Sequence, residues 1–278
     1  MLVTMKQILK FAEAKKIAIG SFNTPNLESL LAIIEAAEEL NMPVIIMHAQ
    51  LHEDIGVCEI EKIGPIMVDM AEKASVPICV HLDHGTDLGY IKKALDIGFT
   101  SVMYDGSEGD VEENIANTAM VVEMAARFGA SVEGEVGSMG KRADGYGNHQ
   151  GESVYTDPVL AQRFVKETGI DALACAFGTV HGISSTKMKL DYDRITMIKE
   201  VVDVPLVMHG ASGLTEAEFK ETIKRGIRKI NYYSNTSKIA AEAVSQKQYK
   251  QFHDIVTDAT NAIKADVKSA MEVFANLK

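Results

Sequence analysis

Eight short apolar runs, each followed by a longer stretch with helical periodicity, constrain the fold of this 278-residue chain. Strand–helix alternation of this kind builds a parallel sheet, and about eight such units favour a closed barrel. The sequence therefore predicts an α/β fold, a single-domain (β/α)8 or TIM barrel. The apolar runs lie at residues 16–22, 43–47, 76–82, 100–104, 131–136, 172–177, 205–209 and 229–233.

Signals for helix ends support this reading. Asp157 and Pro158 are typical of an N-cap and a first helical position, and they open a helix over 157–167. Thr215 and Glu218 form a capping-box pattern in a helix that ends at Gly226. An open doubly wound sheet is the alternative, but the sequence has no G-x-G-x-x-G or Walker-type loop. We therefore expect residues 1–278 to form one barrel domain, with a helical C-terminal extension from about residue 234.

Composition excludes some classes of function. The net charge of −11 argues against non-specific binding of nucleic acid, which needs clustered Lys and Arg. A single phosphate-binding site is still compatible with this charge. The N-terminal segment is amphipathic and unlike a signal peptide, and no apolar run reaches the length of a membrane span. We expect a cytoplasmic protein without a membrane partner, in which Cys79 and Cys175 are small buried hydrophobic residues.

Three histidine–glycine pairs end apolar runs: His84-Gly85, His181-Gly182 and His209-Gly210. Loops that follow the strands of a closed parallel barrel converge at one rim, so the three imidazoles can meet there. Three protein ligands with one open position are typical of a catalytic zinc site. The pattern predicts a metal enzyme.

Acidic residues cluster at the same strand ends. Strand alternation places His81 and Asp83 on one face and turns His84 outward at the rim. We interpret His81 as a core histidine and Asp83 as a proton-transfer group beside the metal. Glu133 and Glu135 have the same parity and would both point inward. Buried carboxylates need partners, either a metal and its hydrogen-bond network or a Lys or Arg.

Two kinds of loop complete the predicted site. Residues 137–153 form a long glycine-rich polar stretch after the fifth run, which predicts a mobile lid over the rim. The segments 178–182, 209–213 and 229–234 supply small residues, hydroxyls and backbone amides at adjacent barrel positions. Barrels commonly bind phosphate at the loops after strands seven and eight, so we expect a phosphorylated substrate.

Several segments resemble the class II, metal-dependent ketose-bisphosphate aldolases, which include fructose- and tagatose-bisphosphate enzymes. The resemblance runs from about residue 5 to 235, and its most specific blocks are VPICVHLDHG and VPLVMHGASGL. It implies a (β/α)8 barrel with catalytic Zn²⁺, or another divalent cation, on His84, His181 and His209. Asp83 would be the acid/base on the aldehyde-derived oxygen.

The same resemblance assigns further residues. Asp105 and Glu135 would serve an alternative or second metal position. The substrate and its phosphate would contact Asn23, Gly182, Gly210, Ala211, Ser212, Asn231 and Ser234. A monovalent cation, Na⁺ or K⁺, would lie near the backbone of Val180, Gly182, Gly210 and Ser212. A homodimer or homotetramer is expected, and the sequence does not decide between them.

The chain departs from the family pattern around the substrate. Ala143 stands where the lid glutamate is expected, with Asp144, His149 or Glu152 as substitutes after a loop shift. Met47-His48-Ala49-Gln50 replaces polar or small residues after the second run, and Tyr233-Ser234 replaces the usual pair after the eighth. These changes leave the metal site intact but indicate a different sugar or reaction.

Three hypotheses follow. The first is a zinc-dependent aldolase that cleaves or forms fructose 1,6-bisphosphate, tagatose 1,6-bisphosphate or a related sugar phosphate through a dihydroxyacetone phosphate enediolate. The second is a sugar-phosphate-binding relative that keeps the metal but has weak or altered lyase activity, because Ala143 replaces the lid glutamate. The third is a Schiff-base aldolase that uses a lysine such as Lys229, which would leave the histidine–glycine pairs without a role.

Overall fold

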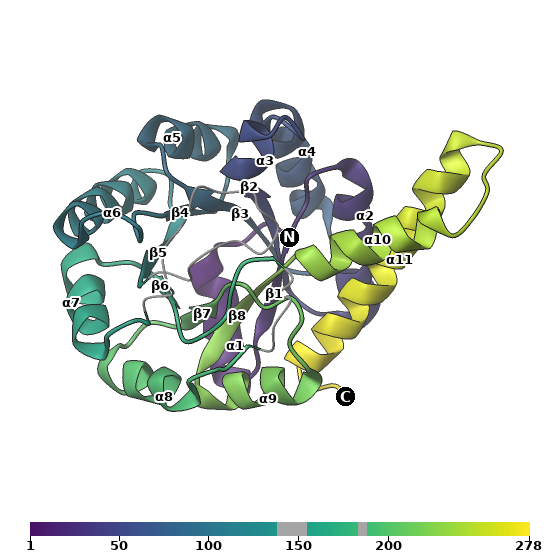
Figure 1. Ribbon diagram of the computed structural model, residues 1–278. Helices are drawn as coiled ribbons and strands as arrows, with labels where there is room; N and C mark the ends of the chain where they lie inside the picture. Colours follow the sequence, from purple (N-terminus) through teal and green to yellow (C-terminus); the bar gives the residue numbers. More distant parts are fainter. Residues whose placement is uncertain (138–154, 183–187) are drawn as a thin grey trace.

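Eight parallel strands form a closed barrel in which each strand pairs with the next and β8 pairs with β1 (Figure 1). The computed structural model describes residues 1–137, 155–182 and 188–278. The barrel confirms the predicted fold, and each strand overlaps one of the eight apolar runs. The strands are β1 (Ile19–Asn23), β2 (Val44–Ala49), β3 (Ile78–Gly85), β4 (Ser101–Tyr104), β5 (Ser131–Val136), β6 (Ala172–Cys175), β7 (Leu206–Met208) and β8 (Ile227–Tyr232).

Helices cover the outside of the barrel, and their ends follow the capping signals. Asp157 accepts a hydrogen bond from the Leu160 amide, and Thr215 and Glu218 form the predicted capping box. The helices in the described residues are α1 (Met5–Lys15), α2 (Leu27–Leu40), α3 (Gln50–Asp54), α4 (Ile60–Lys73), α5 (Leu88–Ile97), α6 (Val111–Ala126), α7 (Pro158–Thr168), α8 (Tyr192–Val201), α9 (Glu216–Arg225), α10 (Ser234–Ser245) and α11 (Phe252–Phe274).

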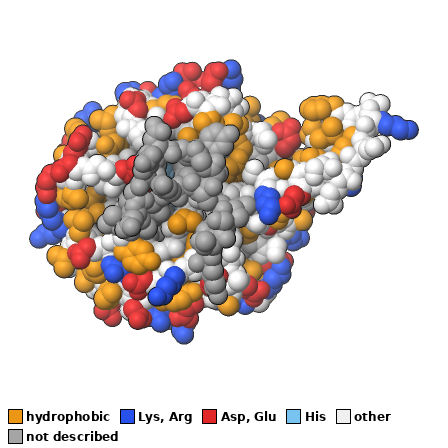
Figure 2. Space-filling model, in the orientation of Figure 1, with side chains coloured by type: hydrophobic (Ala, Val, Ile, Leu, Met, Phe, Trp, Pro, Cys, Tyr) orange, Lys and Arg blue, Asp and Glu red, His pale blue; other side chains and the backbone are white. Residues whose placement is uncertain are grey.

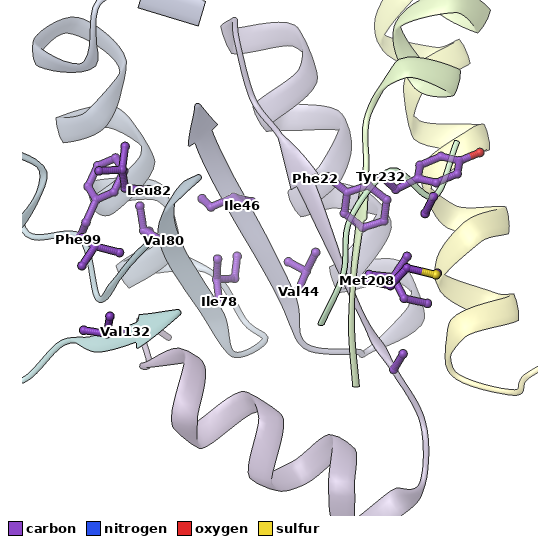
Figure 3. Close-up of a cluster of buried hydrophobic side chains, with 14 of the residues drawn as sticks. Phe22, Val44, Ile46, Ile78, Val80, Leu82, Phe99, Val132, Met208 and Tyr232 are labelled. Carbon is purple, nitrogen blue, oxygen red and sulfur yellow. The ribbon is translucent and has the colours of Figure 1, made fainter. Parts of the chain in front are cut away.

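The hydrophobic core has two layers, because alternate strand residues face opposite sides of the barrel wall. In β3, the outward side chains of Ile78, Val80 and Leu82 join the layer between strands and helices (Figure 3). The inward-facing Cys79 belongs to the interior layer, and the buried side chain of Met5 in α1 joins it there. Helix α1 thus closes the end where the strands begin, which leaves the end where they finish for the functional site.

The last two helices form a hairpin on one side of the barrel. Figure 1 shows that α10 and α11 lie side by side and that their connected ends project away from the strands. The C-terminal part of α11 packs on the barrel through Phe274, which is buried, and Lys268 forms a salt bridge with Glu39 of α2. Among the helices of the described residues, none combines the length and apolar character that crossing a membrane requires.

The predicted lid, residues 137–153, lies outside the described residues except for Gly137. Ala143, which stands where the lid glutamate is expected, lies in the same stretch. So do Asp144, His149 and Glu152, the residues that could replace that glutamate. The lid therefore stays a prediction.

Candidate active site

The three histidines that the sequence singled out come together at the mouth of the barrel. Ring centroids are 4.9 Å apart for His84 and His181, and 4.7 Å apart for His84 and His209. One nitrogen from each ring lies within 4.8 Å of one nitrogen of the others. Tetrahedral zinc holds nitrogen ligands at about 2.0–2.1 Å, so the nitrogens of a loaded site are roughly 3.3 Å apart. Small side-chain movements bring this set to bonding distance, and the donor set fits zinc.

The backbone of His84 aims its ring into this group. Strict strand alternation predicts that His84 turns outward, and here the sequence-based expectation was wrong. His84 has a left-handed backbone with φ of 48°, and the pairing of β3 with β4 shifts register between Leu82 and Gly85. Such a bulge redirects a side chain. A Cβ on Gly85 would lie 2.8 Å from the Met103 carbonyl oxygen, so glycine is required directly after the histidine.

Asp105 and Glu135 lie on the β4–β5 side of the histidines. Together with His84 they form a second group whose ligand atoms are within 4.8 Å of one another. Asp105 Oδ2 is 2.6 Å from His84 Nδ1, and Ser107 donates a 2.7 Å hydrogen bond to Asp105 Oδ1. Burial alone would raise the pKa of Asp105, but the hydrogen bond and charge of His84 hold it below its ordinary range. Burial and the charge of Asp105 raise the pKa of Glu135.

Asp83 is held as an ionised acceptor beside the histidines. Asn23 Nδ2 donates to one carboxylate oxygen at 3.1 Å, and Asn231 Nδ2 donates to the other at 2.9 Å. Asp83 Oδ1 is 3.9 Å from His84 Nε2. Burial would raise the pKa of Asp83, but the charges of His84 and His209 hold it well below its usual range. Both oxygens can therefore accept a proton or a hydrogen bond at neutral pH.

The two inward carboxylates of β5 take different partners. Glu135 lies beside the three histidines, with Oε2 at 3.3 Å from His209 Nδ1. Glu133 accepts a 2.7 Å hydrogen bond from His209 Nε2 and lies 2.9 Å from Lys229 Nζ. Glu133 thus has the Lys partner that the sequence left open, and Glu135 lies among the candidate metal ligands. The contact of Glu133 with His209 was not predicted, because residues 76 positions apart share no local pattern.

His81 is a core histidine, as expected from its place in β3. Its ring is fully buried, and Nδ1 lies 2.8 Å from the Ser101 hydroxyl oxygen. Burial and the nearby Lys229 ammonium lower the pKa of His81 to about 3. The imidazole is neutral at physiological pH and lies beneath the site.

A cavity of about 250 Å³ opens beside the histidines and Asp83. All seven predicted substrate positions line it, namely Asn23, Gly182, Gly210, Ala211, Ser212, Asn231 and Ser234. The sequence did not predict one further wall of the cavity, which Leu51, His52, Ile55 and Val57 supply from α3 and the segment after it. His52 and Tyr233 pack edge to face, with ring centroids 5.0 Å apart. No motif marks His52, whose position follows from the short helix that directly succeeds β2.

Loops after β6, β7 and β8 form the end of the cavity that suits an anion. Gly210 has φ of 62°, and a Cβ there would collide with the backbone of Val180. Helix α10 starts at Ser234 without a side-chain cap, and the Asn235 amide donates to the Ser212 hydroxyl oxygen at 3.3 Å. An uncapped helix N-terminus next to small residues and a hydroxyl is favourable for a phosphate group.

Comparison with known proteins decides the family. The family model described as "Fructose-bisphosphate aldolase class-II" matches residues 3–277. The chain belongs to this family. As a class II aldolase it is a lyase, and aldolases of this class are generally zinc-dependent.

Individual relatives align with nearly the whole length of this class II aldolase. A 6-phospho-5-dehydro-2-deoxy-D-gluconate aldolase from Halalkalibacterium halodurans is 38% identical over 98% of this chain and 96% of its own. The YdjI aldolase from Escherichia coli K12 is 35% identical, with a TM-score of 0.88 over 99% of this chain and 97% of its own. A putative fructose-1,6-bisphosphate aldolase from Coccidioides immitis is 32% identical, with a TM-score of 0.89 over 99% and 98% of the two chains.

Proposed function

We propose that this class II aldolase cleaves and forms a ketose phosphate at a zinc ion held by His84, His181 and His209. The observation that carries the proposal is the convergence of three imidazoles from β3 and the loops after β6 and β7, directly beside the buried Asp83 carboxylate. When bound there, zinc supplies Lewis-acid stabilisation of the negative charge that develops on the ketone oxygen. Asp105 and Glu135 would provide an alternative or second position for a divalent cation.

Asp83 is the proposed acid/base. In the cleavage direction its carboxylate removes the proton from the hydroxyl group whose carbon becomes the aldehyde, as the carbon–carbon bond breaks. Asn23 and Asn231 each donate to one of its oxygens and so fix the carboxylate plane toward the cavity. A positioned proton-transfer group of this kind contributes roughly 10²–10⁴-fold to the rate.

The substrate phosphate is proposed to bind at the β7–β8 end of the cavity. Gly210, Ala211 and Ser212 present backbone amides and a hydroxyl, and Ser234 places the N-terminus of α10 beside them. A monovalent cation is proposed near the Val180, Gly182, Gly210 and Ser212 backbone, where the tight approach of Gly210 to Val180 brings two loops together.

The cavity wall favours a substrate with a single phosphate. Among the described residues that line it there is no Lys or Arg, and α3 and the segment after it contribute the apolar side chains of Leu51, Ile55 and Val57. Within this described part of the lining, a second phosphate on the aldehyde half would find no cationic partner. Two relatives are named 6-phospho-5-dehydro-2-deoxy-D-gluconate aldolase, and the compound in that name has one phosphate group. We therefore propose this compound or a similar ketose monophosphate ahead of fructose or tagatose 1,6-bisphosphate.

The test is release of dihydroxyacetone phosphate by the purified protein loaded with zinc or cobalt. The assay compares 6-phospho-5-dehydro-2-deoxygluconate with fructose and tagatose 1,6-bisphosphate. Faster release from the monophosphate is the expected result. Release from a bisphosphate alone would contradict the single-phosphate proposal, and no release from any of them would favour the metal-retaining binding relative. An Ala143→Glu variant in the same assay measures what the missing lid glutamate contributes.

A homodimer or homotetramer is proposed from the shape of the C-terminal hairpin. Its end projects from the barrel (Figure 1), and Figure 2 shows hydrophobic side chains toward this end. Phe252, the first residue of α11, is 78% exposed. Light scattering coupled to size-exclusion chromatography tests the assembly, and a monomer at micromolar concentration would contradict it.

A further inference from the structure

Lys229 is buried in the barrel interior beneath the site, and the function proposed above does not use it. Its side chain has no exposed surface, and its partners are Glu133 of β5 and Asn231 of its own strand. The described residues that line the cavity include Asn231 but not Lys229. A lysine in this place does not reach a substrate carbonyl, so the Schiff-base role considered from the sequence does not fit its position.

One branch from Lys229 leads to the proposed acid/base. Lys229 Nζ donates a 2.7 Å hydrogen bond to Asn231 Oδ1. An ammonium group has no acceptor, so only the oxygen of the asparagine amide can face it. The amide nitrogen Nδ2 must then point the other way, where it donates to Asp83 Oδ1 at 2.9 Å. Lys229 thereby sets the amide orientation that lets Asn231 hold the Asp83 carboxylate.

A second branch leads to the metal site. Lys229 Nζ lies 2.9 Å from Glu133 Oε2, and Glu133 Oε1 accepts a 2.7 Å hydrogen bond from His209 Nε2. A carboxylate only accepts, so Nε2 of His209 carries a proton and Nδ1 is left for the metal.

We propose that Lys229 is a positioning residue that organises both halves of the site, the Asp83 carboxylate through Asn231 and the metal-binding tautomer of His209 through Glu133. The inference rests on the proposed function for its turnover measurement. Its zinc-binding measurement is independent of any substrate, so a wrong substrate and a wrong role for Lys229 give different results.

The test uses Lys229→Met, which keeps the unbranched shape of the side chain up to Cε and removes the ammonium group with its charge and donors. The expected results are a fall in kcat of at least tenfold, a KM within about threefold of wild type, and zinc affinity lower by 10–100-fold. Wild-type kcat together with wild-type zinc affinity would overturn the proposal. So would a borohydride-trapped substrate adduct on Lys229 of the wild-type enzyme, because this would make the residue a nucleophile.

A double variant separates positioning from simple loss of stability. Lys229→Met leaves the Glu133 carboxylate buried without its cation, which is costly, and Glu133→Gln in the same chain removes that charge. The introduced glutamine side chain can still accept from His209 Nε2, so thermal stability and zinc affinity should return toward wild type. Asn231 still lacks its donor, so kcat should stay at least tenfold low. Full recovery of kcat in the double variant would show that Lys229 only balances a buried charge. It would overturn the proposal that Lys229 positions Asp83 through Asn231.

Discussion

His84 Nδ1 and Asp105 Oδ2 are 2.6 Å apart, and this contact joins the histidine that ends β3 to the carboxylate that follows β4. A carboxylate that holds one ring nitrogen of a metal-binding histidine fixes the tautomer and orientation of that ring. The second carboxylate oxygen of Asp105 is occupied by Ser107. The position of the His84 ring therefore depends on a neighbouring strand as well as on its own backbone.

Removal of this carboxylate should weaken metal binding. We expect Asp105→Ala to lower zinc affinity by about 10–100-fold, the effect typical of a lost outer partner of a ligand. Competition with a chromophoric chelator measures this affinity. Ser107→Ala, which removes one donor to Asp105 and leaves its contact with His84, should cause a smaller loss. Equal zinc affinity in wild type and Asp105→Ala would contradict the role of the contact.

Asp83→Ala should separate chemistry from metal binding. We expect a fall in kcat of roughly 10²–10⁴-fold, because the variant lacks the proposed acid/base. Zinc content should stay at the wild-type level, since Asp83 is not one of the proposed zinc ligands. Steady-state kinetics and metal analysis on the same preparation check both parts. Turnover near the wild-type rate would remove Asp83 from its assigned role.

Gly210→Ala should impair the phosphate end of the cavity. The methyl group would collide with the Val180 backbone and would also strain a residue at φ of 62°. We expect KM to rise at least tenfold. The free energy of unfolding should fall by more than the backbone strain at positive φ causes, because the collision adds to it. Gly129→Ala is the matched control, because Gly129 has φ of 68° and no heavy atom within 4 Å of the added Cβ. This control should lose only about 1 kcal/mol and keep KM. Similar behaviour of the two variants would contradict the close packing at Gly210.

His48 should make stability depend on pH. Burial and the charge of His52 lower its pKa from 6.5 to about 4, against opposing effects of Glu53 and Asp83. Between these values the unfolded chain binds a proton that the folded chain does not, so stability should fall as pH decreases from about 6.5 to about 4. The difference of about 2.5 pKa units corresponds to roughly 3 kcal/mol at the acid end of this window.

Urea unfolding across this pH range measures the effect. His48→Gln keeps a polar partner for the Tyr90 hydroxyl, which lies 2.9 Å from His48 Nε2, and should flatten part of the pH dependence. His253→Gln is the control, because the side chain of His253 is 77% exposed and it should leave the profile unchanged. A profile of His48→Gln that is parallel to wild type would show that His48 is protonated equally in both states.

The sequence predicted the parts of this structure that follow local patterns. The apolar runs coincide with the strands, and the histidine–glycine pairs come together because a closed parallel barrel brings every strand end to one rim. The direction of the His84 ring was missed, because strand alternation holds only without a bulge. Glu133 with His209, and His52 with Tyr233, join residues that are far apart in the sequence and come from barrel units with one strand between them, so no local spacing predicts them.

The convergence of His84, His181 and His209 on one cation is tested most directly by anomalous diffraction at the zinc absorption edge from crystals of the zinc-loaded protein. The account predicts an anomalous peak at the barrel mouth, with one nitrogen of each of the three rings about 2.0–2.1 Å from it. A zinc-loaded crystal in which any one of these rings lies beyond bonding distance of the ion, in every copy of the chain, would contradict it.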